Sequence, residues 1–342
     1  MIDPLSRIAS IDLPTVEKAT VRIEPWRLKT PFTIARGVEY EISLVVVELS
    51  GKGATGYGES CPVAHYGETP KSVAAQVETF LERLRSGQSW ASIHDQLPAG
   101  AARNAVDCAV WDFAAKWVEK PIFDLIDVAA PQPVETVFTI SFAEPDVMAK
   151  QAASAKNFRK LKLKLGGEGD LERVQAVRKV APDKVLIADV NEYWDDALFS
   201  SLQGAIAAAG ISMLEQPLPA NDDGLLESAE HLTLIGADES CHVSNDLDQV
   251  ARRYDVVNIK LDKTGGFTEA LRLLDGALSR GLQPMVGCML GTSLAVAPAF
   301  YIAQKCSFVD LDAPLLIGKD RDPAMEYNNG WVSPSASSLI WG

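Results

Sequence analysis

The feature that most constrains this chain is a series of short apolar runs that recur at regular spacing and carry charged residues at their ends. The charged positions are Lys162 and Lys164 in LKLKLGG, Asp189 in VLIADVN, Glu215 in SMLEQP, Asp238 in LIGADES and Lys260 in VVNIKLDKTGG. Successive runs lie about 22 to 26 residues apart, the length of one strand–helix unit in a parallel α/β array. Each charged residue is therefore expected at the carboxyl end of a parallel strand, where barrel enzymes carry their catalytic groups.

Eight strand candidates follow one another from residue 134 onward. They are TVFTISF, KLKLKL, VLIADV, SMLEQP, LIGADES, VVNIKL, QPMVGC and FVDLDA. Eight parallel strands with helices between them predict an α/β fold of the (β/α)8 barrel type over residues 131–313. The alternative is an open doubly wound sheet, which usually has a Gly-rich fingerprint after its first strand, and this chain has none.

The first part of the chain, residues 1–130, lacks this repeat. Strands are expected between residues 17 and 50, followed by the Gly-rich hairpin GKGATGYGES and by helices in KSVAAQVETFLERLRS and AARNAVDCAVWDFAAKWVEK. The tail, residues 314–342, has no further strand–helix unit and is expected to return to this first part. Together they predict an α+β domain that covers the barrel.

Composition limits the partners and the compartment. A formal net charge of -14 argues against nucleic acid and anionic membranes as partners. No apolar run approaches the roughly 20 residues of a membrane span, and the first residues do not resemble a signal peptide. The five cysteines show neither a CxxC pair nor zinc-ligand spacing, as expected for free thiols in a cytoplasmic protein. We further expect a homo-oligomer.

Three acids, Asp189, Glu215 and Asp238, fall at matching ends of consecutive strands. A single acid after a strand is more often a helix N-cap than a ligand. Three of them would converge on one arc of the barrel mouth and repel one another unless they were neutralised. Mg²⁺ suits a few carboxylates and leaves coordination positions open for a substrate, so the pattern predicts a magnesium site.

The lysines suggest a reaction. Lys162 and Lys164 share one face of their strand, and Lys260 lies four strands later, diametrically opposite in a ring of eight. Mg²⁺ on a substrate carboxylate would acidify the adjacent C–H and stabilise an enediolate. Lys164 and Lys260 would then remove and return a proton on opposite faces, which inverts that carbon. Crowding by Mg²⁺ and a neighbouring lysine would lower the pKa of the basic amine, and Lys162 would stabilise the developing negative charge.

The eighth strand ends in Asp310-Leu311-Asp312, which places two acids on one face. In isolation such a pair is more often a cap with a buried ion pair. Within this ring, however, the two acids are expected to hold a cationic group such as a free α-ammonium.

At these residues the chain resembles the enolase superfamily, and within it the muconate-lactonizing-enzyme subgroup. The resemblance covers essentially the whole chain and implies a modified, enolase-like barrel with an α+β capping domain. The Asp310–Asp312 pair, TPFTIARG and VGCM are most similar to the dipeptide epimerases, which invert the α-carbon of the C-terminal residue of a dipeptide. The resemblance implies Mg²⁺ as cofactor, a small-molecule dipeptide as substrate, and substrate contacts from Thr139, Lys162, the backbone at Cys288, Asp310 and Asp312.

The stretch after the ARG turn departs from the pattern associated with L-Ala-L-Glu. A basic residue is expected there, but this chain has Val38, Glu39, Tyr40 and Glu41. If Glu39 or Glu41 faces the substrate, a carboxylate side chain on the second residue is disfavoured, and a hydrophobic or cationic one is expected instead. If both face solvent, they carry no specificity.

Other activities stay open. Muconate cycloisomerase, o-succinylbenzoate synthase and N-acylamino acid racemase share the motif set, but the first two have no ammonium in their substrates for Asp310 and Asp312 to bind. A Schiff-base aldolase would use one lysine, such as Lys260, without a metal. A binding protein that keeps the barrel only as a scaffold is expected to have lost part of the ring, yet every position is filled.

Overall fold

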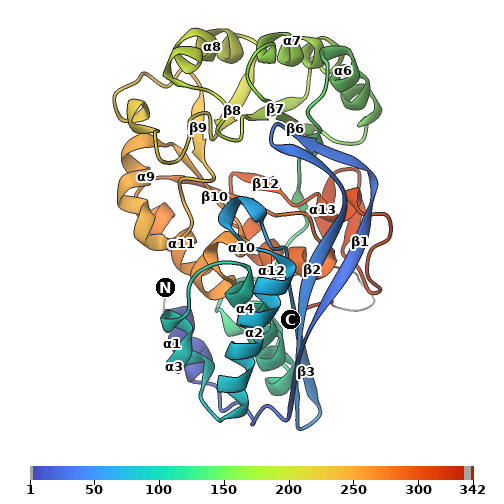
Figure 1. Ribbon diagram of the computed structural model, residues 1–342, viewed down its shortest axis with the longest axis vertical. Helices are drawn as coiled ribbons and strands as arrows, with labels where there is room; N and C mark the ends of the chain where they lie inside the picture. Colours follow the sequence, from blue (N-terminus) through green and yellow to red (C-terminus); the bar gives the residue numbers. More distant parts are fainter. Residues whose placement is uncertain (1–2, 335–339) are drawn as a thin grey trace.

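The computed structural model describes residues 3–334 and 340–342, and its centre is a parallel sheet of eight strands (Figure 1). The strands are neighbours in sequence order: β5 (Phe138–Ile140), β6 (Lys160–Lys164), β7 (Val185–Asp189), β8 (Ile211–Glu215), β9 (Leu234–Ala237), β10 (Val256–Ile259), β11 (Gln283–Gly287) and β12 (Phe308–Asp310). The backbone N–H of Val137 donates to Val309 O at 2.9 Å, so the chain entering β5 lies beside β12. The predicted barrel is therefore confirmed as a nearly closed ring.

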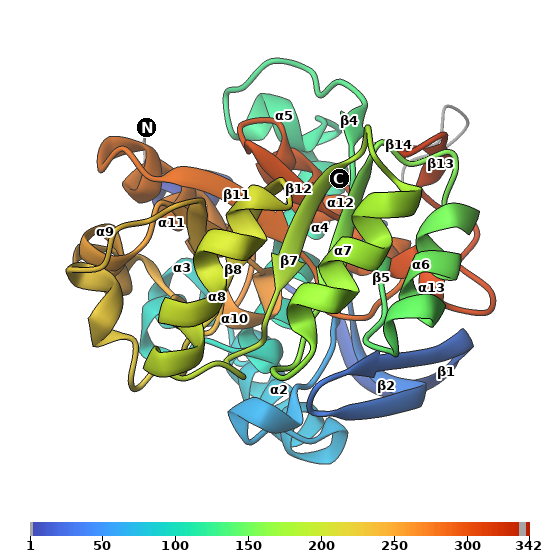
Figure 2. The same ribbon diagram turned by 90° about the horizontal axis from the view of Figure 1, so that it is seen from above.

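Helices cover the outside of this ring (Figure 2). They are α6 (Pro145–Ser154), α7 (Asp170–Val180), α8 (Asp196–Ala208), α9 (Leu247–Arg253), α11 (Phe267–Ser279) and α12 (Ser293–Ala303). Leu161 and Leu163 of β6 belong to the apolar core beneath them, which turns the lysines of that strand toward the barrel interior. Only the crossover from β8 to β9 differs from the expected repeat. There Pro217, Pro219 and Gly224 interrupt helical geometry, and the segment forms only the 3₁₀ turn η3 (Gly224–Glu227).

The N-terminal part is an antiparallel sheet with two helices packed against it. The sheet contains β1 (Lys18–Ile34), β2 (Gly37–Gly51) and β3 (Ala54–Ser60), and the helices are α2 (Pro70–Arg85) and α4 (Ala101–Val118). Thr69 caps α2, where its hydroxyl accepts from Ser72 N at 3.1 Å. Gly58 allows β3 to lie directly on α4, because a Cβ at that position would lie 2.0 Å from Ala105 O. The long β1–β2 hairpin reaches from this part up to the barrel (Figure 1).

The described residues of the tail contact both parts. Ile317 forms a bridge with Leu28 of β1, and the indole of Trp341 donates to Cys108 O in α4 at 2.9 Å. Strands β13 (Glu326–Asn328) and β14 (Trp331–Ser333) pair with β4 (Val134–Glu135), which leads into the amino-terminal end of β5. These contacts support the boundary near residue 130 and the return of residues 314–342, both of which we propose as the domain division.

Short elements complete the described chain. They are α1 (Pro4–Ala9), η1 (Ala64–Tyr66), α3 (Trp90–Ile93), η2 (His94–Gln96), α5 (Ile122–Leu125), η4 (Ser244–Asp246), α10 (Leu261–Thr264) and α13 (Ala313–Leu316).

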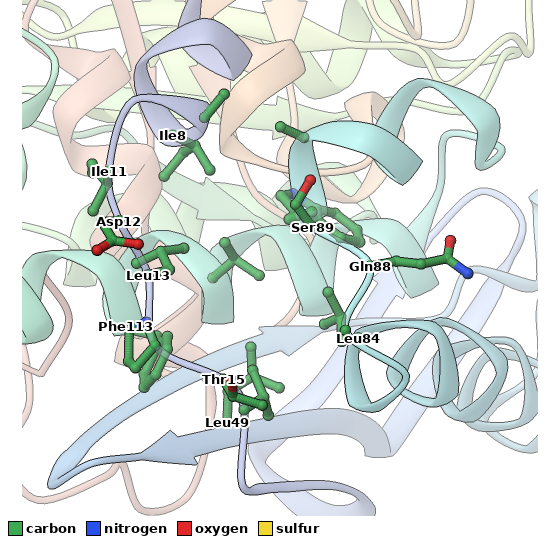
Figure 3. A pocket seen from close by; sticks show the side chains of 17 residues that line it. Ile8, Ile11, Asp12, Leu13, Thr15, Leu49, Leu84, Gln88, Ser89 and Phe113 are labelled. Atoms are coloured by element: carbon green, nitrogen blue, oxygen red, sulfur yellow. The ribbon is translucent and has the colours of Figure 1, made fainter.

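A cavity of about 330 Å³ lies under the segment after α1 and is lined mostly by apolar side chains such as Ile11, Leu84 and Phe113 (Figure 3). None of the charged residues at the barrel mouth lines it. Within the described residues, no helix combines the length and the apolar character that crossing a membrane requires.

Candidate active site

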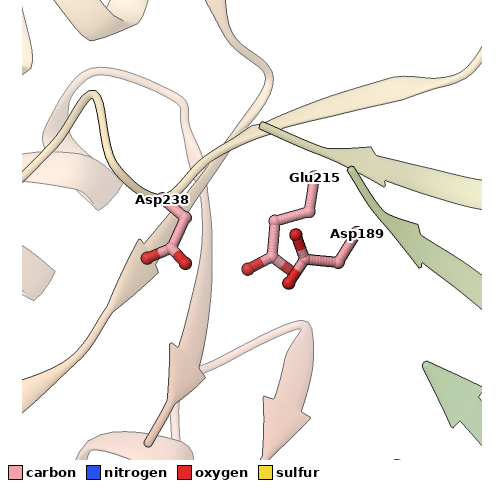
Figure 4. Close-up of side chains that lie close together, drawn as sticks. All are labelled: Asp189, Glu215 and Asp238. Carbon is pink, nitrogen blue, oxygen red and sulfur yellow. The ribbon is translucent and has the colours of Figure 1, made fainter. Parts of the chain in front are cut away.

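Three carboxylates converge at the carboxyl ends of adjacent strands (Figure 4). Asp189 ends β7, Glu215 ends β8 and Asp238 follows β9. All three are buried, and one oxygen from each lies within 4.8 Å of the others. The parallel register aligns the strand ends, so acids distant in sequence meet at one point.

The geometry of this group fits a small divalent cation. Ligand oxygens at about 2.1 Å from Mg²⁺ in an octahedron lie about 3 to 4.2 Å apart, which the observed spread accommodates. Glu215 Oε2 and Asp238 Oδ1 are buried and accept no well-directed hydrogen bond from the described residues, although lysine ammonium groups lie 2.8 and 2.7 Å away. Buried acceptors with unused lone pairs and a hard-oxygen donor set match what Mg²⁺ requires.

Lysines surround the three acids. Lys162 lies 3.0 Å from Asp189, 2.8 Å from Glu215 and 2.8 Å from Asp310 in its closest N–O approaches. Lys164 contacts Asp189 at 2.7 Å, whereas Lys260, the residue after β10, contacts Asp238 at 2.6 Å. Three strands separate β6 from β10 in either direction around the ring, so Lys164 and Lys260 approach the acids from opposite sides.

Burial and neighbouring charge shift the pKa in opposite directions on the two lysines and in the same direction on Glu215. Burial alone would lower the pKa of Lys260, but Asp238 outweighs it and holds that pKa above its usual value. Burial would likewise lower the pKa of Lys162, yet Asp189 and Asp310 raise it well above the usual range. For Glu215, burial and the nearby Asp189 raise the pKa to about 7. The acids that pair with Lys162 and Lys260 thus hold the pKa of both amines up, opposite to the direction that the sequence predicts for a basic lysine beside Mg²⁺.

The acidic pair at the end of β12 lies at one wall of the same site. Asp310 ends β12, and Asp312 accepts from Thr139 N on β5 at 2.6 Å. Burial, followed by the charge of Asp310, raises the pKa of Asp312 to about 7. The Cys288 thiol donates to Asp310 O at 3.2 Å and burial raises its pKa well above the usual value. A cation beside this pair would therefore favour the charged form of Asp312.

A single cavity of about 520 Å³ joins these groups. Its lining includes Thr139, Lys162, Lys164, Asp238, Lys260, Cys288, Asp310, Asp312, Glu39 and Glu41. Asp189 and Glu215 lie behind this lining, in contact with Lys162. The structure thus brings together every predicted site residue, including the two glutamates on β2.

The hairpin tip is fixed over the barrel mouth by partners that the sequence did not identify. Arg36, at the turn between β1 and β2, pairs with Glu192 at 2.5 Å and with Glu239 at 2.7 Å. Tyr193 OH donates to Ala35 O at 3.0 Å. Glu239 directly follows Asp238, and strict strand alternation would turn it away from the site. Because β9 ends at Ala237, the loop brings both side chains inward.

Two further residues that the sequence did not predict contact Glu215 and Asp238 of the candidate metal site. Asn258 of β10 donates to Glu215 Oε1 at 2.7 Å. Lys263 is fully buried, lies 2.7 Å from Asp238 Oδ1 and donates to the carbonyl oxygens of Cys241 and Asn258. Lys263 comes three residues after Lys260, a helical spacing that could have indicated a common direction for the two amines.

Asp262 connects the barrel to the N-terminal part. Its carboxylate accepts from Cys61 N at 3.0 Å and from Asn104 Nδ2 at 2.9 Å. Burial raises the pKa of Asp262 to about 7, against the two hydrogen bonds that lower it. The folded protein therefore holds this proton more tightly than the unfolded chain does, and the stability that the group contributes is present below pH 4 and is lost as the pH rises to about 7.

Asp262→Asn is expected to remove this part of the pH dependence, because the amide oxygen can still accept both hydrogen bonds and carries no charge. Relative to the variant, the unsubstituted protein should lose on the order of 2 kcal/mol of unfolding free energy between pH 5 and pH 8. Urea unfolding at the two pH values measures this difference. Asp196→Asn, on the surface of α8, is the matched control. Equal pH dependence of Asp262→Asn and the parent would contradict the assignment.

Comparison with known proteins identifies the family to which this architecture belongs. Residues 16–127 match the N-terminal domain of the mandelate racemase / muconate lactonizing enzyme family, and residues 147–336 match the enolase C-terminal domain-like family. The L-Ala-D/L-Glu epimerase of Escherichia coli (strain K12) is 44% identical over 315 residues, which cover 91% of this chain and 98% of that protein.

Two solved structures share the fold over nearly the whole chain. An enolase family member from Agrobacterium tumefaciens, described with homology to dipeptide epimerases and with bound sodium and L-Ala-L-Glu, is 42% identical with a TM-score of 0.92, covering 95% of this chain and 99% of that one. A dipeptide epimerase from Enterococcus faecalis V583, complexed with Mg and L-Leu-L-Tyr, is 28% identical with a TM-score of 0.84, covering 93% and 97%. The chain therefore belongs to the mandelate racemase / muconate lactonizing enzyme family of the enolase superfamily.

Proposed function

We propose that this protein is a Mg²⁺-dependent dipeptide epimerase, an isomerase that inverts the α-carbon of the C-terminal residue by 1,1-proton transfer. The observation that carries this proposal is the position of Lys164 and Lys260 on opposed strands on either side of three buried carboxylates. Relatives named as epimerases, and the E. faecalis structure with Mg and a dipeptide, support the same activity.

Asp189, Glu215 and Asp238 would hold the cation. When bound, Mg²⁺ supplies Lewis acidity to a substrate carboxylate and thereby makes its α-proton easier to remove. Asn258 holds Glu215 in place, and Lys263 does so for Asp238, so both acids keep a fixed direction toward the site.

Lys164 and Lys260 would carry the proton. Each Nζ lies beside a different acid of the group, and a substrate α-carbon held between them presents one face to each amine. One lysine takes the proton from its face and the other delivers a proton to the opposite face, so the configuration inverts. Lys162, buried beneath them, would place its positive charge next to the substrate carboxylate.

Asp310 and Asp312 would bind the ammonium group of the first residue. A cation placed there would stabilise the charged form of Asp312 against the burial and the neighbouring Asp310 that raise its pKa. Thr139 fixes the direction of Asp312, and the backbone at Cys288 lines the same wall. This preference for an ammonium group disfavours N-acylamino acids, muconate and o-succinylbenzoate precursors as substrates.

Incubation of an L,L-dipeptide library in D₂O with Mg²⁺ tests the activity. We expect deuterium at the α-carbon of the C-terminal residue together with formation of the L,D isomer, both detected by mass spectrometry and NMR. N-acetylation of the same dipeptides removes the ammonium charge and should reduce kcat/KM about 100-fold or more, because buried acids are left unpaired. Absence of exchange in every dipeptide would refute the proposed function.

We further propose a cytoplasmic location. All five cysteines are free thiols in the structure, the state that a reducing compartment maintains.

A further inference from the structure

The charges that line the active-site cavity are not balanced. Lys162, Lys164 and Lys260 are each paired with the buried acids at 3.0 Å or less. Arg36 is also committed, because its guanidinium binds both Glu192 and Glu239. Every lysine and arginine that lines this cavity therefore already has an anionic partner.

Glu39 is different. It lines the cavity from β2 and forms no ion pair or side-chain hydrogen bond with any described residue. Glu41, two residues along the same strand, lies 3.9 Å from Arg27, and both side chains are more than half exposed, so this pair contributes little neutralisation. The β2 wall thus presents two carboxylates whose charge is not matched from within the protein.

A third acid on the cavity wall has an unused acceptor. Glu239 is 7% exposed, and although its Oε1 pairs with Arg36, its Oε2 accepts no hydrogen bond from the described residues. Because this oxygen has almost no exposed surface, it is closed to a ligand, and Glu239 acts on the cavity through its pairing with Arg36.

The same wall offers apolar surface for an aliphatic chain. Phe32 lies directly across from Glu39 in the β1–β2 register, and Ile34 and Leu316 also line the cavity. A long side chain can pack its methylene groups on these residues and bring a terminal charge to Glu39. A carboxylate side chain in the same place would be repelled by Glu39 and would find Arg36 already paired.

We propose that the preferred substrates are dipeptides whose second residue has a cationic side chain, as in lysine or arginine, and that Glu39 determines this preference. The inference rests on the proposed epimerase activity and adds to it the chemical class of the second residue.

The experiment compares α-proton exchange in D₂O for two pairs of dipeptides that differ in charge at similar size. L-Ala-L-Lys is compared with L-Ala-L-norleucine, and L-Ala-L-Glu with L-Ala-L-Gln. We expect kcat/KM for L-Ala-L-Lys to exceed that for L-Ala-L-norleucine about tenfold or more. We expect kcat/KM for L-Ala-L-Glu to lie about tenfold below that for L-Ala-L-Gln. These factors are the scale of a partly solvated charge contact. High ionic strength should bring both ratios closer to one, because salt screens the charge contact.

Glu39→Gln should bring both ratios about tenfold closer to one. Glu41→Gln should change them less, because Glu41 lies near Arg27. Glu48→Gln is the matched control on the same strand. Glu48 lies outside the cavity beside Lys18, so this substitution should leave both ratios as they are. A change of overall folding would alter all four rates together, whereas the ratios report charge recognition.

The outcomes separate the two levels of the proposal. Exchange that favours L-Ala-L-Glu over L-Ala-L-Gln, or ratios that Glu39→Gln does not change, would overturn the cationic preference and leave the epimerase activity standing. Absence of exchange in all four dipeptides, and in the wider library, would overturn the epimerase activity itself.

Discussion

Lys260→Ala and Lys164→Ala are each expected to lower the rate of epimerisation by about 10²- to 10⁴-fold, the usual contribution of a positioned acid or base. Inversion needs both lysines, since one removes the proton and the other supplies it on the opposite face. Either substitution alone therefore slows the complete reaction. Chiral chromatography of the L,L and L,D products gives the rates.

The two variants should differ in isotope exchange. Each keeps one lysine, which can still remove and return a proton on its own face. Lys164→Ala and Lys260→Ala should therefore retain α-proton exchange with opposite isomers of the same dipeptide and lose it with the other isomer. This complementary pattern distinguishes two opposed bases from a general loss of structure.

Lys160→Ala provides the control on the same strand. Lys160 begins β6, at the end opposite to the site, and pairs with Glu135 at 3.2 Å. Its replacement should leave epimerisation and both exchange reactions intact. Identical exchange patterns for Lys164→Ala and Lys260→Ala would show that the two lysines do not act on separate faces.

Glu215→Gln is expected to weaken Mg²⁺ binding by about 100-fold or more, because losses of 10- to 100-fold already follow from changes behind the ligands. Glu215 is fully buried between Lys162 and Asn258, and glutamine has the same shape, so the fold should persist. Loss of the negative charge removes the attraction for the cation. Isothermal titration calorimetry with Mg²⁺ measures the change directly, independently of turnover.

Asp196→Asn again serves as the surface control and should bind Mg²⁺ as the parent does. An unchanged Mg²⁺ affinity in Glu215→Gln would remove Glu215 from the proposed site. Chelation by EDTA should abolish α-proton exchange, and added Mg²⁺ should restore it. Activity that survives chelation, together with borohydride trapping of a carbonyl compound on Lys260, would instead favour a Schiff-base aldolase.

Much of the barrel could be predicted because its signals are local. Each of the eight predicted runs contains a strand, since buried parallel strands are built from short segments rich in apolar residues. The segment between β8 and β9 departed from the expected repeat. Its prolines and Gly224 were visible in the sequence, but the regular spacing of the neighbouring runs concealed the missing helix.

The candidate site could be predicted where residues project from strand ends. Asp189, Glu215, Asp238 and Lys260 meet because the parallel register aligns the strands that carry them. Their roles in catalysis and metal binding stay predictions until the experiments above are done. Glu239 was missed because its direction depends on where β9 ends, which alternation along a strand does not reveal.

The sequence by itself determined the class of fold, the spacing of the charged strand ends and the family resemblance, because all three are encoded by residues near one another in the chain. Only the tertiary structure decided which charges are paired. Arg36 reaches Glu239 across about 200 residues of sequence, and Glu39 reaches the cavity without a cationic partner. Such pairings depend on how the β1–β2 hairpin lies over the barrel, and packing between distant segments has no local pattern in a single sequence.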